Sequence, residues 1–71
     1  MNDWFEAEQH YERAHEFYEA GRWDEAESEL RQALALNPYR AEWHFNLALT
    51  LEAAGRFEAA IRALEDAHRL D

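Results

Sequence analysis

The chain contains the same stretch of sequence twice, 34 residues apart, and this internal repeat limits the architecture more than any other feature. The clearest match is Ala20-Gly21-Arg22, which recurs as Ala54-Gly55-Arg56. Other identical pairs at the same offset are Ala7 with Ala41, Glu8 with Glu42, His10 with His44, Ala14 with Ala48, Ala26 with Ala60, Leu30 with Leu64, Ala33 with Ala67 and Leu36 with Leu70. A chain of 71 residues is too short for two ordinary domains, so we interpret it as one small domain built from two copies of a single unit.

Within each unit, apolar residues recur every three or four positions, which is the period of an amphipathic helix. In the first unit this pattern runs through Ala7, Tyr11 and Ala14. Gly21 and Gly55 interrupt the pattern where a helix would end, because glycine accepts the left-handed conformation common at helix C-termini. We therefore predict an all-α fold with helices over residues 4–20, 23–36, 38–54 and 57–70.

Two polar signals predict where helices start. Asn37 followed by Pro38 is typical of an N-cap and the first helical residue, where the missing N–H of proline removes no hydrogen bond. Asp3 and Glu6 have the spacing of a capping box. The third helix is therefore expected to begin at Pro38, and the first directly after Asp3.

Small residues stand where the two antiparallel helices of each unit would cross, because alanine allows close backbone approach. The predicted crossings are the pairs Ala14–Ala26 and Ala48–Ala60. We expect the aromatic residue after each turn to cover the open end of its hairpin, and a leucine further along to fill the middle. These residues are Trp23 and Leu30 in the first unit, and Phe57 and Leu64 in the second.

Charge and composition exclude several classes of function. Sixteen Asp and Glu residues against seven Lys and Arg give a net charge of −9, which would repel a nucleic-acid backbone. No apolar run approaches the roughly 18 residues that cross a bilayer, and residues 1–4 do not resemble the start of a signal peptide. Because the chain has no cysteine, disulfides and thiolate metal sites are also excluded. We expect a cytoplasmic protein that binds neither nucleic acid nor membranes.

The residue types of catalytic sites are present without the spacing that catalysis or metal binding needs. His10 and His15 project to different helix faces, and no paired ligands share a face with a third. Ser28 lies within a predicted helix, and no glycine-rich phosphate loop is present. We therefore expect no enzyme activity, no metal and no cofactor. His10 and His44 should be packed between helices, so that their burial weakens folding as the pH falls.

The repeat resembles the tetratricopeptide repeat (TPR) family. The 34-residue period, the glycine turn and Pro38 carry the resemblance, together with a run of residues in the second unit: Asn46, Leu47, Ala48, Gly55, Phe57, Ala60, Ile61, Leu64 and Ala67. The first unit departs at Arg13, where the family usually has Leu, and at Glu27, which suggests that one side of its helix pair faces water. The resemblance implies one domain over residues 1–71, with repeats at 7–40 and 41–71 forming a short right-handed α-solenoid.

The resemblance also implies that the first helix of each repeat lines a concave groove for a peptide or protein segment. The residues in groove positions are Glu8, Tyr11, Glu12, His15, Tyr18, Glu42, Phe45, Asn46, Leu49 and Glu52. Their aromatic rings offer rigid apolar contact area, and their carboxylates favour Lys and Arg on the partner. The implied function is a protein–protein interaction module that binds a basic or apolar segment.

One TPR subclass grips the terminal carboxylate of chaperone tails with Lys, Asn and Arg side chains. Asn46 fits that pattern, but Tyr11 and His15 stand where the subclass has Lys and Asn. An acidic groove that lacks these cations would repel a carboxylate, so we do not expect chaperone-tail binding.

Two repeats would leave one helix face without a neighbour, because repeat stacks gain stability from contacts between adjacent repeats. The residues expected to be partly uncovered on this face are Ile61, Leu64, Ala67 and Leu70. Two alternatives to the groove function follow. In the first, the chain forms homo-oligomers through this face, for example as a dimer swapped at residues 37–40. In the second, it is an N-terminal fragment of a longer TPR scaffold, and the two alternatives are compatible.

Overall fold

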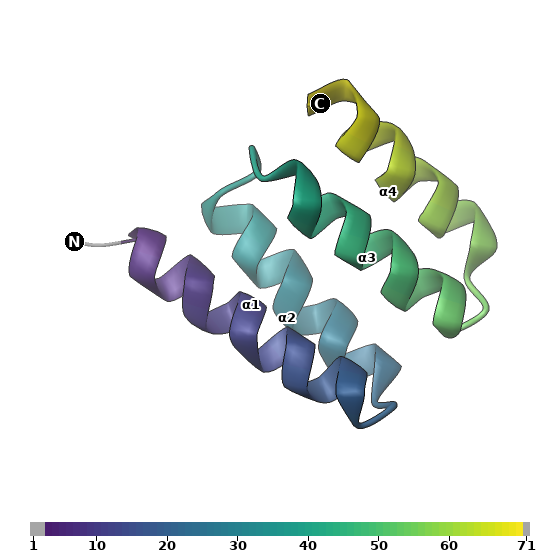
Figure 1. Ribbon diagram of the computed structural model, residues 1–71, viewed down its shortest axis with the longest axis horizontal. Helices are drawn as coiled ribbons and strands as arrows, with labels where there is room; N and C mark the ends of the chain where they lie inside the picture. The colour runs from purple at the N-terminus through teal and green to yellow at the C-terminus, as the bar shows by residue number, and fades with distance from the viewer. Residues whose placement is uncertain (1–2, 71) are drawn as a thin grey trace.

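The computed structural model describes residues 3–70, and this part of the chain forms four α-helices. They are α1 (Asp3–Glu19), α2 (Trp23–Leu36), α3 (Ala41–Ala53) and α4 (Phe57–Leu70). Helix α1 packs on α2, α2 on α3 and α3 on α4, so two helical hairpins lie side by side (Figure 1). The predicted all-α fold and the pairing of the helices are confirmed.

The turns after α1 and α3 have the same backbone geometry. Both glycines lie in the left-handed region, with φ angles of 74° at Gly21 and 82° at Gly55. In the second turn the Arg56 N–H donates to the Leu51 carbonyl oxygen at 2.8 Å, and the first turn has the equivalent bond. These bonds complete a Schellman motif, which satisfies carbonyl groups that the helix end leaves unpaired. The predicted role of the two glycines is confirmed.

The predicted start of the third helix is wrong by three residues, since α3 begins at Ala41 rather than Pro38. Asn37 ends α2 instead, and its backbone N–H donates to the Ala33 carbonyl at 2.9 Å. The Asn37 side chain accepts the Tyr39 N–H at 3.4 Å, which favours a turn over a helix at Pro38. At the other end of the described chain, Asp3 lies inside the first turn of α1 rather than before it.

The core is built around small residues on the paired helices and large ones on α3. All four alanines of the predicted crossings are buried: Ala14, Ala26, Ala48 and Ala60. Trp43, Leu47 and Leu51 of α3 pack into the same cluster as Ala33 and Leu34 of α2. Because α3 contributes to both hairpins, one continuous core joins the two repeats.

The second repeat is less covered than the first, as predicted for the α4 face, although two of its residues do not take the hairpin positions expected of them. Leu30 is 2% exposed, whereas its counterpart Leu64 is 44% exposed and does not fill the middle of a hairpin. Trp23 packs edge-on against Tyr18 at 5.2 Å, whereas its counterpart Phe57 is largely exposed. Leu64 is exposed because α3 covers the first hairpin and no described helix covers the second in the same way. Phe57 differs from Trp23 because Glu52 stands where the first repeat has Tyr18.

Arg13 and Glu27, the two residues of the first repeat that depart from the family pattern, both form ion pairs. Glu27 accepts hydrogen bonds from Arg56, in the turn between α3 and α4, and from Arg31 on its own helix. The Glu27 side chain is only 16% exposed, although the sequence predicted that it faces water. Its ion pair with Arg56 links the two repeats. Arg13 lies 3.4 Å from Glu29 across the α1–α2 pair and is half exposed.

Candidate functional site

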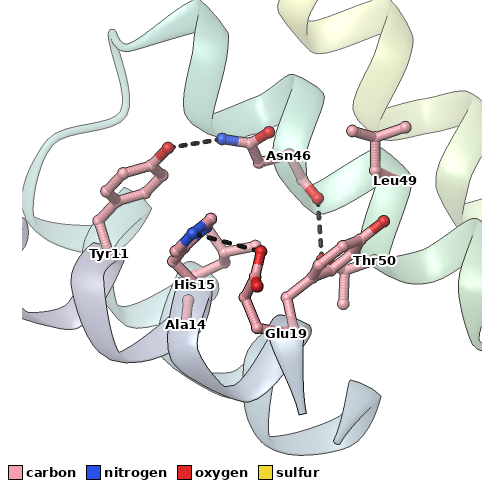
Figure 2. Close-up of a pocket in the computed structure, with 9 residues that line it drawn as sticks. Tyr11, Ala14, His15, Glu19, Asn46, Leu49 and Thr50 are labelled. Carbon is pink, nitrogen blue, oxygen red and sulfur yellow. Dashed lines mark hydrogen bonds and ion pairs between the residues drawn. The ribbon is translucent and has the colours of Figure 1, made fainter. Parts of the chain in front are cut away.

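A pocket of about 130 Å³ lies between α1 and α3, and we call it the α1/α3 pocket (Figure 2). Its lining residues are Tyr11, Ala14, His15, Tyr18, Glu19, Leu30, Asn46, Leu49 and Thr50. The buried Ala14 and Leu30 supply apolar surface, and the tyrosines and Leu49 add to it. Since small-molecule pockets usually measure roughly 300–1,000 Å³, this volume suits one side chain of a bound peptide better than a whole ligand.

Tyr11 is held at this pocket by contacts with α3. The Asn46 side-chain amide donates to the Tyr11 hydroxyl oxygen at 2.8 Å, and the two residues face each other across the pocket (Figure 2). The Tyr11 ring also stacks on Trp43, with centroids 5.2 Å apart and planes 13° from parallel. Because both ends of the side chain have partners, Tyr11 offers a surface with little conformational entropy to lose on binding.

The polar groups at the pocket carry more negative than positive charge. His15 Nε2 lies 3.6 Å from a Glu19 carboxylate oxygen. Glu12 and Glu16 line a shallow depression next to the pocket together with Tyr11 and His15. In the described part of the chain, neither of these two carboxylates forms an ion pair. They are therefore free to interact with a cationic partner.

The predicted groove residues separate into different surfaces. Five of them line the α1/α3 pocket, namely Tyr11, His15, Tyr18, Asn46 and Leu49. Glu12 lies in the adjacent depression, Glu52 is exposed on α3, and Glu8 accepts a hydrogen bond from Arg40 at 2.9 Å. Glu42 and Phe45 line another depression, between α3 and α4.

Four further pocket residues were missed from the sequence, namely Ala14, Glu19, Leu30 and Thr50. Thr50 lies one helical turn after Asn46, and its hydroxyl donates to the Asn46 carbonyl at 2.9 Å (Figure 2). Helical periodicity alone could have found Thr50 and Glu19. Leu30 comes from α2, a helix that the family resemblance does not assign to the groove.

The face of α4 predicted to be uncovered is confirmed only in part. Ile61, Leu64 and Leu70 are exposed, but Ala67 is buried at 8% exposure. Ala67 projects toward α3 together with Ala60 and Ala63, which are also buried on α4. Leu64 and Ala67 nevertheless line the same depression between α3 and α4, whereas Ile61 and Leu70 lie outside it.

His10 and His44, which the sequence predicts to pack between helices, each contact a polar group. His10 Nδ1 is 2.6 Å from Glu29 Oε1, and Arg13 also contacts this carboxylate. His44 Nε2 donates to the Pro38 carbonyl oxygen at 2.9 Å. Burial acts to raise the pKa of Glu29, but the hydrogen bonds and charges of His10 and Arg13 outweigh it and hold that pKa below its ordinary value of 4.5.

This shift predicts how acid affects folding. Because the folded-state pKa of Glu29 is lowered, its contribution to stability is present above pH 4.5 and is lost as the pH falls through the lower folded value. We expect Glu29→Gln to reduce the unfolding free energy at about pH 7 and to have a much smaller effect at about pH 3. Urea unfolding at both pH values measures the difference. A penalty equal at both pH values would contradict the assignment.

The described residues contain no group of three or more His, Asp or Glu side chains arranged to hold a metal ion. No helix within residues 3–70 is both long and apolar enough to cross a membrane.

A family model for the tetratricopeptide repeat matches residues 11–71, which is most of the chain. The chain therefore belongs to the tetratricopeptide repeat family. Repeats of this kind are generally protein–protein interaction modules and are typically non-catalytic, so protein partners are the general expectation. A comparison with curated proteins gives no match.

Proposed function

We propose that this protein binds a short segment of a partner protein at the α1/α3 pocket, and that the segment carries an apolar or aromatic residue next to Lys or Arg. The observation that supports this most is an apolar pocket sized for one side chain, next to a depression lined by Glu12 and Glu16, which form no ion pair within the described residues. The apolar side chain would enter between Tyr18 and Leu49. The basic residue would contact Glu12 or Glu16, where a cation is favoured.

The charge part of the proposal has a direct test. Short random peptides displayed on phage are selected on the protein, and selected peptides are synthesised for affinity measurement. We expect enrichment of Lys or Arg beside an apolar residue. Replacing Glu12, Glu16 and Glu52 together by Gln should weaken binding about tenfold or more at low salt, and by less at high salt.

The control changes the net charge equally at a distance from the pocket. Asp3→Asn, Glu58→Gln and Glu65→Gln remove three carboxylates that line neither the pocket nor the depression next to it, and binding should stay within about twofold. Equal losses in the two triple variants would show that only overall charge matters. Selected peptides without basic residues would contradict the proposal.

Self-association is the second candidate function, and the exposed Ile61, Leu64 and Leu70 favour it. Light scattering over a concentration series measures the mass of the chain, which is 8.4 kDa as a monomer. A dimer that Leu64→Glu abolishes would support self-assembly. A monomer at all concentrations would contradict self-assembly and favour the binding of a partner protein.

A further inference from the structure

The depression between α3 and α4, which we call the α3/α4 depression, has a counterpart in the first repeat. Its lining residues are Ala41, Glu42, Phe45, Leu64, Ala67 and His68. The residues 34 positions earlier are Ala7, Glu8, Tyr11, Leu30, Ala33 and Leu34. In the first repeat this surface is covered by helix α3. The first repeat therefore indicates what kind of structure the same surface of the second repeat accommodates.

Helix α3 covers the first surface through apolar and charged contacts. Trp43 stacks on Tyr11 and is itself 1% exposed, while Leu30 beneath α3 is 2% exposed. Arg40, just before α3, donates to Glu8 at 2.9 Å. The Arg40 guanidinium also lies 4.5 Å from the Trp43 ring centroid, a cation–π distance. An arginine three residues before a tryptophan thus anchors the start of the covering helix.

The same positions of the second repeat lack this cover. Leu64 is 44% exposed and Phe45 is 48% exposed. Glu42 is the counterpart of Glu8, and the only cation near it in the described chain is Arg40 at 3.8 Å, which makes its shorter contact with Glu8. The depression therefore combines apolar surface with a carboxylate whose counterpart binds an arginine.

We propose that the α3/α4 depression binds an amphipathic helix of a partner protein, and that this helix repeats the pattern of α3. The pattern is an arginine, an aromatic residue three positions later, and leucines four and eight positions after the aromatic residue, as in Arg40, Trp43, Leu47 and Leu51. The aromatic residue would pack on Phe45, and the arginine would pair with Glu42. This surface is distinct from the α1/α3 pocket and binds a helix rather than a peptide side chain.

A second copy of this chain fits the depression less well. In a head-to-tail stack the next copy would present α1, which carries Gln9, Arg13 and Glu16 where α3 carries Trp43, Leu47 and Thr50. Burying these polar groups against Leu64 would leave them without hydrogen-bond partners, which is costly. A symmetric contact between two α4 helices would bring together chains that each carry a net charge of −9.

The experiment uses a synthetic peptide of residues 37–54 with a fluorescein label, because α3 already fits the equivalent surface. The whole protein is titrated into the peptide and fluorescence anisotropy is recorded. We expect saturable binding that Leu64→Glu weakens about tenfold or more. Trp4→Glu is the matched control: it places the same charge on an exposed position of α1, away from α4 (Figure 1), and should change affinity less than about twofold. Circular dichroism confirms that both variants are folded.

A charge exchange tests the predicted ion pair. Arg40→Glu in the peptide should weaken binding to the wild-type protein, because two carboxylates would then face each other. Glu42→Arg in the protein should restore the binding of this altered peptide and weaken that of the unaltered one. This reciprocal pattern cannot arise from a general loss of folding.

Three results would overturn the proposal. Peptide binding that Leu64→Glu leaves unchanged would mean that the peptide replaces α3 within the protein's own fold. If the charge exchange had no reciprocal effect, the arginine of the bound helix would not pair with Glu42. A chain that dimerises without the peptide, and monomerises with Leu64→Glu, would assign the depression to a second copy. The Gln variants of Glu12, Glu16 and Glu52 should leave peptide binding unchanged, which separates this site from the α1/α3 pocket.

Discussion

Trp43→Ala is expected to remove most of the protein's unfolding free energy at 25 °C. Replacing a buried tryptophan by alanine typically costs about 3–5 kcal/mol, and small domains have stabilities near the low end of about 5–15 kcal/mol. Trp43 is 1% exposed and contacts both Tyr11 and Arg40 by its ring. Its loss would open a cavity at the junction of α1, α2 and α3. Far-UV circular dichroism during urea unfolding measures the effect.

Trp43→Phe is the matched control, because it keeps an aromatic ring against Tyr11. It also removes the indole N–H, which is buried and has no hydrogen-bond partner in the described chain. Loss of an unsatisfied donor offsets part of the lost contact area, so we expect a cost of about 1–2 kcal/mol and a folded protein. If Trp43→Ala unfolded at the same urea concentration as the wild type, the expected contribution of the Trp43 side chain to stability would be refuted.

Ala26→Leu is expected to have the second largest effect on stability. Ala26 is 0% exposed on α2, which packs against both α1 and α3, so three further carbon atoms would have to displace its neighbours. Overpacking of this kind typically costs about 1–3 kcal/mol, since the helices must separate or adopt strained rotamers. At about 4–8 °C per kcal/mol for a domain of this size, the melting temperature should fall by several degrees or more.

Ala35→Leu is the control for this substitution, because it adds the same atoms to an exposed position of the same helix. We expect its melting temperature to stay within a few degrees of the wild type, since surface substitutions usually change stability by less than about 0.5 kcal/mol. Thermal unfolding of both variants checks the comparison. A loss of stability that is equal at both positions would indicate an effect on helix propensity and not on packing.

The local features of the fold were predictable because they depend on neighbouring residues. Helical periodicity located the four helices, and the glycines at 21 and 55 marked the turns, since only the local backbone conformation decides these features. The wrong prediction that the third helix begins at Pro38 also has a local cause. The side chain of Asn37 can cap a following helix or hold a turn, and here the hydrogen bond to Tyr39 accompanies the turn.

The candidate site was less predictable because it depends on contacts between helices. Tyr11 and Phe45 occupy equivalent positions in the two repeats, yet Tyr11 is fixed at a pocket by Asn46 and Trp43, whereas Phe45 lines a separate, open depression. The family resemblance placed both in one groove. A repeat in the sequence makes two positions alike in residue type, but each environment depends on which helix packs against it.

The sequence by itself determined the repeat, the helical class, the glycine turns and the burial of the four alanines at the predicted crossings, because these follow from residue type at a fixed spacing. The tertiary structure alone decided that Leu30 is buried while Leu64 is exposed, that Glu27 pairs with Arg56, and that the predicted groove divides into separate surfaces. The physical reason is that burial and ion pairing depend on neighbours distant in the chain. Here α3 covers the first repeat, and no described helix covers the second in that way.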